Sequence, residues 1–295
     1  MRRYLILDVF TATPLEGNSL AVVLDGESLS DAAMQSIAAE FNLSETVFVL
    51  PPDNPVHTAK LRIFTPKSEL PFAGHPTVGT AVALAVERGH AMDADALLIL
   101  EEKIGAVRCF VQRRDGGGHA RFDAPRLPSP LAVADHEVIA SALGLLPVDL
   151  GFENHIPSGY DSGVPHVFVP VRNLETIARV APQTAVWRAA FGTSPAYVYT
   201  RETASVARQF HARMFAPHLG IAEDPATGSA AVGFAGVIHR FDAHPDGSHA
   251  FIIEQGFEMG RPSLLHLEVD VEGAVIARIR LGGDTIIVAE GTLNL

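Results

Sequence analysis

Short runs of alternating apolar and polar residues recur along most of the chain, which is typical of strands that bury one face. Between two of them, apolar residues recur at helical spacing from Met34 to Phe41, and Ser30 is a suitable N-cap for that helix. Shorter helices are predicted at residues 135–143 and 174–181. Strands are predicted at residues 4–10, 20–24, 46–50, 61–64, 97–101, 107–112, 120–122, 164–171, 196–200, 210–215, 250–254, 264–271, 275–281 and 285–289.

Two further segments, residues 76–88 and 228–238, are apolar around the whole helical circumference. A helix of this kind is buried, because it has no polar face to turn toward water. Each follows the same run of residues: a strand ending in Phe-x-Pro, a short loop, a polar residue before proline, and a small-residue helix start. The polar residues are His75 in the first copy and Asp224 in the second.

The two copies are separated by about half of the 295-residue chain, far more than the period of about 20–50 residues of a solenoid. The chain therefore reads as a duplicated domain. Proline-spaced residues 125–130 give the boundary, with halves at residues 1–127 and 128–295. The strand near residues 285–295 can also pack on the first half.

Strands that curl around one buried helix, twice over, predict an α+β fold of two similar half-barrels. We expect the N-termini of the two buried helices to face a shared cleft. Free backbone N–H groups and the helix dipole at such ends favour a small anion. A carboxylate, sulfate or phosphate is therefore expected between the helix starts near residues 76–79 and 228.

Composition narrows the classes of partner. The chain is 47% apolar and 19% charged, with a net charge of −12, which disfavours nucleic acid and anionic membranes as partners. Its longest apolar stretch, near residues 80–86, is far shorter than the ~20 residues that span a bilayer. No signal-peptide pattern follows Met1, so a cytoplasmic protein is expected. The single cysteine, Cys109, excludes an internal disulfide and a thiolate metal cluster.

Metal and cofactor motifs are scarce. His239, His244 and His249 are the nearest approach to a histidine cluster, and they are interpreted as a solvated surface turn. Neither a phosphate-binding P-loop nor a dinucleotide-binding glycine motif is present, and Gly116–Gly118 reads as a hairpin tip. We therefore expect neither a metal nor a cofactor.

Glu45 is the first candidate for proton transfer. It stands at a helix-to-strand junction beside apolar Val47, Phe48 and Val49, and apolar neighbours tend to raise the pKa of a carboxyl group. Such a group can both take and return a proton near neutrality. The alternative is a surface glutamate at the end of a helix.

His75 and Asp224 each have two interpretations. Either could be the N-cap of the helix that follows, because proline suits the first helical position. Either could also contact a ligand at that helix end. Gly74, Gly79, Gly228 and Ser229 could likewise hold an anion through close backbone approach, or serve close helix packing, which is the simpler account of Gly79 and Gly228.

Four stretches together resemble the phenazine-biosynthesis isomerases, the PhzF-like family. They are residues 8–11 with 17–22, 42–46, 64–66 through 72–79, and 223–230. That family is similar in fold to diaminopimelate epimerase. The resemblance implies a cofactor-independent homodimeric isomerase with Glu45 as acid/base and His75 and Asp224 assisting it. It also implies a small carboxylic acid as substrate, of the trans-dihydro-hydroxyanthranilate type. We assign Asn18, Gly74, Gly79, Gly228 and Ser229 to substrate binding, with the Ser229 hydroxyl as the better ligand contact.

Comparison with the epimerase sharpens the mechanism. That enzyme uses one cysteine from each half, whereas Ala73 and Pro225 stand in those places here and Cys109 lies elsewhere. A two-thiol epimerisation is thereby excluded, and one carboxylate suits removal of a proton and its return to another atom. Two alternatives stay open: a catalytically silent protein that binds small carboxylates, and an amino-acid epimerase or racemase that uses no cysteines.

Overall fold

The structure is a computed structural model that describes residues 1–295. The chain forms two compact units, the first of Met1–Pro125 with Arg280–Leu295 and the second of Arg126–Ile279. None of the helices combines the length and the apolar character that crossing a lipid bilayer requires. The helices are α1 Asp31–Phe41, α2 Gly74–Glu87, α3 His136–Ala142, α4 Leu174–Ala178, α5 Thr184–Phe191 and α6 Gly228–Asp242, with 3-10 turns at Pro147–Asp149 and Pro217–Leu219.

The strands confirm the β-rich pattern of the sequence. They are β1 Arg2–Val9, β2 Asn18–Val23, β3 Glu45–Leu50, β4 Ala59–Phe64, β5 Glu69–Leu70, β6 Asp95–Glu102, β7 Gly105–Arg114, β8 Gly117–Asp123, β9 Ser129–Leu131, β10 Ser158–Asp161, β11 Pro165–Pro170, β12 Ala196–Thr200, β13 Phe210–Ala216, β14 Ile221–Asp224, β15 Gly247–Gln255, β16 Ser263–Glu272 and β17 Val275–Leu293.

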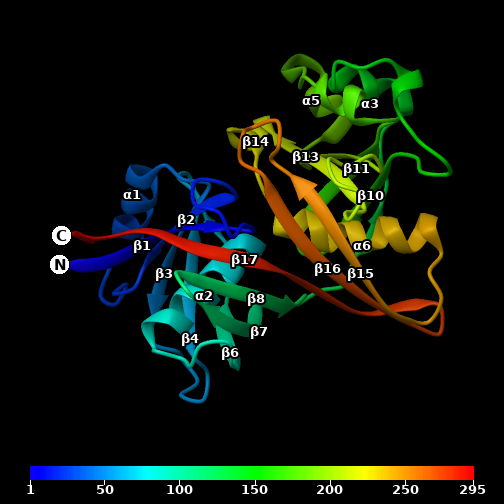
Figure 1. Ribbon diagram of the computed structural model, residues 1–295. Coiled ribbons are helices and arrows are strands. Elements are labelled where there is room, and N and C mark those ends of the chain that lie inside the picture. Colours follow the sequence, from blue (N-terminus) through cyan, green and yellow to red (C-terminus); the bar gives the residue numbers. More distant parts are fainter. The chain divides into compact units, whose positions relative to one another are not determined.

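The first unit is a closed circuit of strands around α2. Its order is β17–β1–β2–β3–β4–β6–β7–β8 and back to β17, so the strands that begin and end the chain lie side by side (Figure 1). α2 contacts β1, β2, β3, β6, β7 and β8. Its residues from Gly74 to Ala85 are all buried, which confirms the prediction from its apolar circumference.

In the second unit, strands likewise pack against a buried helix, α6. Phe234 of α6 packs among the rings of Phe168, Tyr197, Tyr199 and Phe210, with ring centroids 4.7–5.8 Å away. A separate apolar cluster lies where α3 and α5 pack together. The buried helix therefore again supplies the centre of the core.

Strand pairing confirms the duplication. In the first unit, β2 pairs with β3 in parallel, β3 with β4 and β4 with β5 antiparallel, and β4 with β6 in parallel. In the second unit, β11 pairs with β12 in parallel, β12 with β13 and β13 with β14 antiparallel, and β13 with β15 in parallel. The two predicted repeats, residues 61–88 and 212–239, occupy the same places in the two series.

The N-cap interpretation of His75 and Asp224 is wrong for both residues. α2 begins at Gly74, so His75 lies inside its first turn, and the N-cap is Ala73, which makes no side-chain capping bond. α6 begins at Gly228 with Thr227 as N-cap, so Asp224 precedes the helix and ends β14 instead. Proline lies near both helix starts. It does not show whether the polar residue before it stands ahead of the helix or inside its first turn.

Two other expectations change. The predicted strands at residues 275–281 and 285–289 are one strand, β17. Only Gly116 of the predicted hairpin tip lies in the turn, whereas Gly117 and Gly118 belong to β8. A side chain at Gly117 would lie 2.0 Å from the Thr285 carbonyl oxygen, so this glycine permits the close approach of β17.

Candidate active site

Three polar side chains of the first unit meet at the N-terminal end of α2. Glu45 is the first residue of β3, where the helix-to-strand junction was predicted, and Asn18 is the first residue of the neighbouring parallel strand β2. His75 is the second residue of α2. The starts of two parallel strands and one buried helix thus bring together residues that are up to 57 positions apart.

The imidazole of His75 lies between the other two groups. Its Nε2 is 3.4 Å from Glu45 Oε2, and its Nδ1 is 3.4 Å from Asn18 Nδ2. The His75 side chain is 4% exposed and that of Glu45 is 13% exposed. Glu45 therefore keeps some access to a ligand, while His75 is covered by protein.

Burial decides the charge of His75. It lowers the pKa of His75 to about 3, so the ring is neutral near pH 7. The contact with Glu45 is therefore that of a neutral imidazole with a carboxyl group, even though the distance would allow an ion pair.

The contact with Asn18 decides the tautomer of His75. An amide nitrogen only donates, so Asn18 Nδ2 makes His75 Nδ1 an acceptor and leaves the ring hydrogen on Nε2. The Nε2 atom that carries it lies 3.4 Å from Glu45 Oε2 and forms no hydrogen bond with it in this structure. The arrangement is a carboxyl group with a fixed neutral N–H donor, which suits a group that takes up and gives back a proton.

Asp224 belongs to a second polar network, in the second unit. It is 6% exposed, and its Oδ2 accepts a hydrogen bond of 2.6 Å from the Thr227 hydroxyl. Gln255 Nε2 donates to the Asp224 carbonyl oxygen at 2.8 Å and to Thr227 Oγ1 at 3.0 Å. The Gln255 oxygen accepts from the Thr227 backbone N–H at 3.2 Å. Each member of this network therefore has a consistent set of donors and acceptors.

Gln255 and Gly256 were missed by the sequence analysis. Gly256 has a φ of +78°, and a side chain there would lie 2.6 Å from the Pro225 carbonyl oxygen. A Gln-Gly pair at the end of a predicted strand marks a turn in the sequence. Its contact with the Asp224 turn, 31 residues away, depends on the parallel pairing of β13 with β15 and could not be read from the pattern.

The remaining predicted residues lie at the two helix starts. Gly74 and Gly228 are the first residues of α2 and α6, and Ser229 is the second residue of α6. The Ser229 carbonyl oxygen accepts a bond from Ser162 Oγ. A side chain at Gly79 would lie 2.6 Å from Leu20 Cδ2 and 2.7 Å from Val9 Cγ2, which favours the packing interpretation of Gly79.

One group of possible metal ligands was not predicted. Ligand atoms of Glu153, His155 and Asp242 lie within 4.8 Å of one another. The guanidinium of Arg201 lies 2.6 Å from Asp242 Oδ1 and 3.3 Å from Glu153 Oε2, so a cationic side chain already balances these carboxylates. The histidine turn of the sequence analysis is only partly right, because His239 lies on α6 and His249 on β15.

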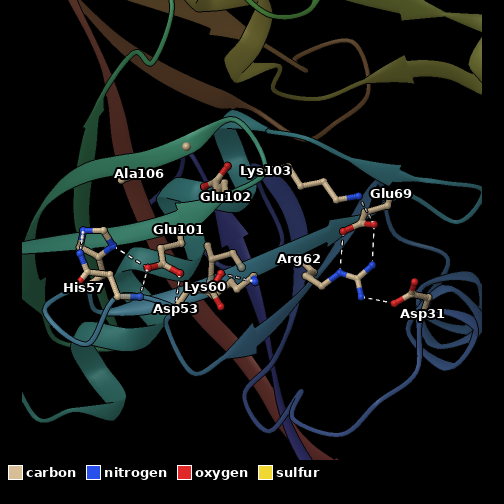
Figure 2. A pocket seen from close by; sticks show the side chains of 13 residues that line it. Asp31, Asp53, His57, Lys60, Arg62, Glu69, Glu101, Glu102, Lys103 and Ala106 are labelled. Atoms are coloured by element: carbon tan, nitrogen blue, oxygen red, sulfur yellow. Dashed lines mark hydrogen bonds and ion pairs between the residues drawn. The ribbon is translucent and has the colours of Figure 1, made fainter.

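A groove of about 900 Å³ in the first unit is lined mainly by charged residues of β4, β6 and neighbouring turns (Figure 2). Neither Glu45 nor His75 lines it. Arg62 is paired with Glu69 and Asp31, and Lys103 is also paired with Glu69. Because these charges neutralise one another, we place the chemistry at Glu45 and His75 instead.

The comparisons with known proteins cover nearly the whole chain. Residues 7–291 match the family model described as phenazine biosynthesis-like protein, PhzC-PhzF. A Mesorhizobium japonicum protein named as an uncharacterized isomerase is 51% identical, over 99% of this chain and 98% of its own. Trans-2,3-dihydro-3-hydroxyanthranilate isomerase of Pseudomonas chlororaphis is 35% identical over 100% of both chains. The crystal structure of a PhzF-family protein of Bacillus anthracis has a TM-score of 0.88 at 28% identity, covering 100% of this chain and 99% of that one.

Proposed function

The chain belongs to the phenazine biosynthesis-like protein family and is an isomerase, and we propose that it moves a proton within a small amino- or hydroxycarboxylic acid without a cofactor. The observation that carries this proposal is the placement of Glu45. Its carboxyl group is partly open to a ligand and faces the N–H donor of a neutral, buried histidine.

In the proposed reaction, Glu45 accepts a proton from a C–H bond of the substrate and returns it to a different atom of the same molecule. We propose that the Nε2 hydrogen of His75 bonds to the carboxylate between turnovers and stabilises its charge, which requires the 3.4 Å separation from Glu45 Oε2 to shorten. Because the pKa of His75 is far below neutrality, the histidine orients Glu45 and does not itself deliver a proton. Acid–base catalysis of this kind contributes about 10²–10⁴-fold.

We assign Asp224 and Ser229 to substrate binding and proton handling in the same reaction. The sequence motif that they share with the first repeat supports this assignment, and so does the network of Thr227 and Gln255 that fixes the Asp224 turn. The backbone at Gly74 and Gly228 is proposed to bind the substrate carboxylate, since each glycine opens a buried helix.

The proposed substrate class is a cyclic acid of the trans-2,3-dihydro-3-hydroxyanthranilate type. A relative with that named activity aligns with the full length of this chain at 35% identity, which supports the class. We further propose a cytoplasmic homodimer, on the family resemblance. Sedimentation should then give a species of twice the 31.5 kDa chain mass.

Solvent deuterium tests the function directly. A panel of small carboxylic acids that includes the named compound is first screened for thermal stabilisation, since a ligand at ~100 times its Kd adds ~2.7 kcal/mol. Each stabilising acid is then incubated with the protein in D₂O and followed by NMR. An isomerase gives a rearranged product or a deuterated carbon position. Stabilisation without either change would favour a silent binding protein.

A further inference from the structure

The hydroxyl of Thr77 faces two acceptors with only one hydrogen to give. Thr77 is fully buried in the first turn of α2, and its Oγ1 lies 2.8 Å from the Ala73 carbonyl oxygen and 2.7 Å from Glu102 Oε1. A carbonyl oxygen only accepts. Both contacts can be hydrogen bonds only if Glu102 is protonated and donates its own hydrogen to Thr77 Oγ1.

Glu102 has the surroundings of a neutral acid. It is 7% exposed at the end of β6, and its Oε2 has no hydrogen-bond partner. Burial raises the pKa of Glu102 to about 8, although the bond with Thr77 acts in the opposite direction. The nearby cations of the groove, Arg62 and Lys103, are bound to Glu69, and no interaction drawn in Figure 2 reaches Glu102.

We propose that Glu102 is a positioning residue that acts as a protonated acid. It donates to Thr77 Oγ1, Thr77 donates to the Ala73 carbonyl oxygen, and this chain fixes the α2 turn that holds His75 against Glu45. The bond from Thr77 Oγ1 adds to the one that the Ala73 carbonyl oxygen accepts from the Thr77 backbone N–H. The link to catalysis rests on the proposed function, whereas the link from Glu102 to His75 does not.

Loss of the Glu102 proton should loosen the turn. An ionised Glu102 would take the hydrogen of Thr77, so the bond from Thr77 Oγ1 to Ala73 would be lost, and a buried negative charge would appear beside the turn. Besides the groove residues Lys60, Arg62, Glu101 and Lys103, the neighbouring strands carry Cys109 of β7, on which Glu102 and Asp123 of β8 act electrostatically. Burial, followed by the charges of Glu102 and Asp123, raises the pKa of Cys109 well above its usual value, so the thiol stays protonated through this range.

Glu102→Gln is the informative variant, because its amide donates to Thr77 at every pH. Turnover of the wild type should fall about tenfold per pH unit above the Glu102 midpoint, as for loss of one required proton. Glu102→Gln should keep the turnover at pH 7 and lose this alkaline limb. Thr77→Ser, which keeps the hydroxyl, should behave as the wild type. An unchanged alkaline limb in Glu102→Gln, or loss of its turnover at pH 7 in a folded protein, would overturn the proposal.

A second measurement needs no substrate. The ring signals of His75 and the carboxyl carbon of Glu102, assigned by comparison with His75→Gln and Glu102→Gln, are followed by NMR from pH 6 to 10. Both should titrate together with a midpoint near 8 in the wild type, and the His75 shift should vanish in Glu102→Gln. A Glu102 carboxyl signal that does not titrate between pH 6 and 10, as expected for an ordinary pKa of ~4.3, would refute the inference whatever the enzyme does. Linked titration without turnover of any acid would instead refute the proposed function alone.

Discussion

Two buried threonines near the starts of the two buried helices have different hydrogen-bond surroundings, Thr77 inside the first turn of α2 and Thr227 as the N-cap of α6. Thr227 Oγ1 donates to Asp224 and accepts from Gln255, so its single hydroxyl hydrogen is enough for both bonds. Thr77 Oγ1 meets two oxygens, those of Ala73 and Glu102, and the network is complete only with a second hydrogen from the acid. The polar network at the helix start is therefore completed by an amide in the second unit and, in our proposal, by a protonated carboxyl group in the first.

This difference shows what the duplication has kept and what it has changed. Strand pairing and the buried helix are the same in both units, whereas the polar residue before proline lies inside α2 as His75 and ahead of α6 as Asp224. The first unit presents a neutral imidazole beside Glu45, and the second presents a carboxyl group fixed by Thr227. The two repeats thus supply different chemistry from one architecture.

Gln255→Glu and Glu102→Gln, which exchange the amide and the acid, should change the free energy of unfolding by very different amounts. Gln255→Glu removes the donor to Asp224 and Thr227 and adds a buried charge beside Asp224, so it should destabilise the protein by about 3–5 kcal/mol. Urea unfolding measures the loss, with the reverse exchange Glu102→Gln as the matched control. A loss below about 1 kcal/mol in Gln255→Glu would remove the distinction between the two networks.

Glu102→Gln should change how stability depends on pH. The pKa of Glu102 is raised on folding to about 8, so the native state binds an extra proton and stability falls as pH rises from the unfolded value toward 8. Below pH 6.5, buried His75 acts oppositely, because its folded pKa of about 3 makes stability fall as pH falls.

The effect of Glu102 is therefore clearest between pH 6.5 and 8. Over that window the wild type should lose roughly 2 kcal/mol relative to Glu102→Gln, at about 1.36 kcal/mol per pH unit. Thermal or urea unfolding at several pH values gives both curves. Parallel curves for the two proteins would mean that Glu102 is already ionised at pH 6.5.

Removing each threonine hydroxyl should give the next smaller effect. Thr227→Val leaves Asp224 Oδ2 and Gln255 Nε2 with one bond fewer in a buried site, which should cost about 1–3 kcal/mol. Thr77→Val should cost about 0.5–1.5 kcal/mol, because the Ala73 carbonyl oxygen keeps its bond from the Thr77 backbone N–H. Denaturant unfolding of the two variants measures both losses of stability. A larger loss in Thr77→Val than in Thr227→Val would contradict the hydrogen bonding described for the two threonines.

Cys109→Ala should have the smallest effect on catalysis. Cys109 is buried on β7, and burial raises the pKa of its thiol, so it is neither exposed nor ionised near neutrality. Turnover per folded molecule should be unchanged on an acid that the wild type converts. A folded Cys109→Ala protein without activity would show that the Cys109 thiol takes part in catalysis.

Much of this fold was predictable from the sequence because its signals are local. The all-apolar pattern found α2 and α6, and Ser30 caps α1 as expected, accepting a bond from the Ala33 N–H. The repeat predicted the matching strand series. The start of α6 at Gly228 was predicted, whereas the start of α2 at Gly74 was placed two residues too late, since a polar residue before proline can stand in a first turn or ahead of it.

The residues of the candidate site could be predicted only where they belong to one of the sequence motifs. Asn18, Glu45 and His75 were named, and the structure brings them together. Gln255 and Glu102 were not, because each acts through a contact with a residue at least 25 positions away along the chain. An amide and an acid at the ends of two strands carry no local pattern that marks such a role.

The central claim is that Glu45 carries the proton, and a Glu45→Gln exchange experiment tests it most directly. Wild type and variant are saturated with the same converted acid in D₂O, with thermal stabilisation confirming equal binding, and deuterium entry into the substrate C–H position is followed by NMR. The account predicts that exchange and turnover fall together by at least ~10²-fold, because the amide cannot accept a proton. Exchange at the wild-type rate in folded, ligand-bound Glu45→Gln would contradict it.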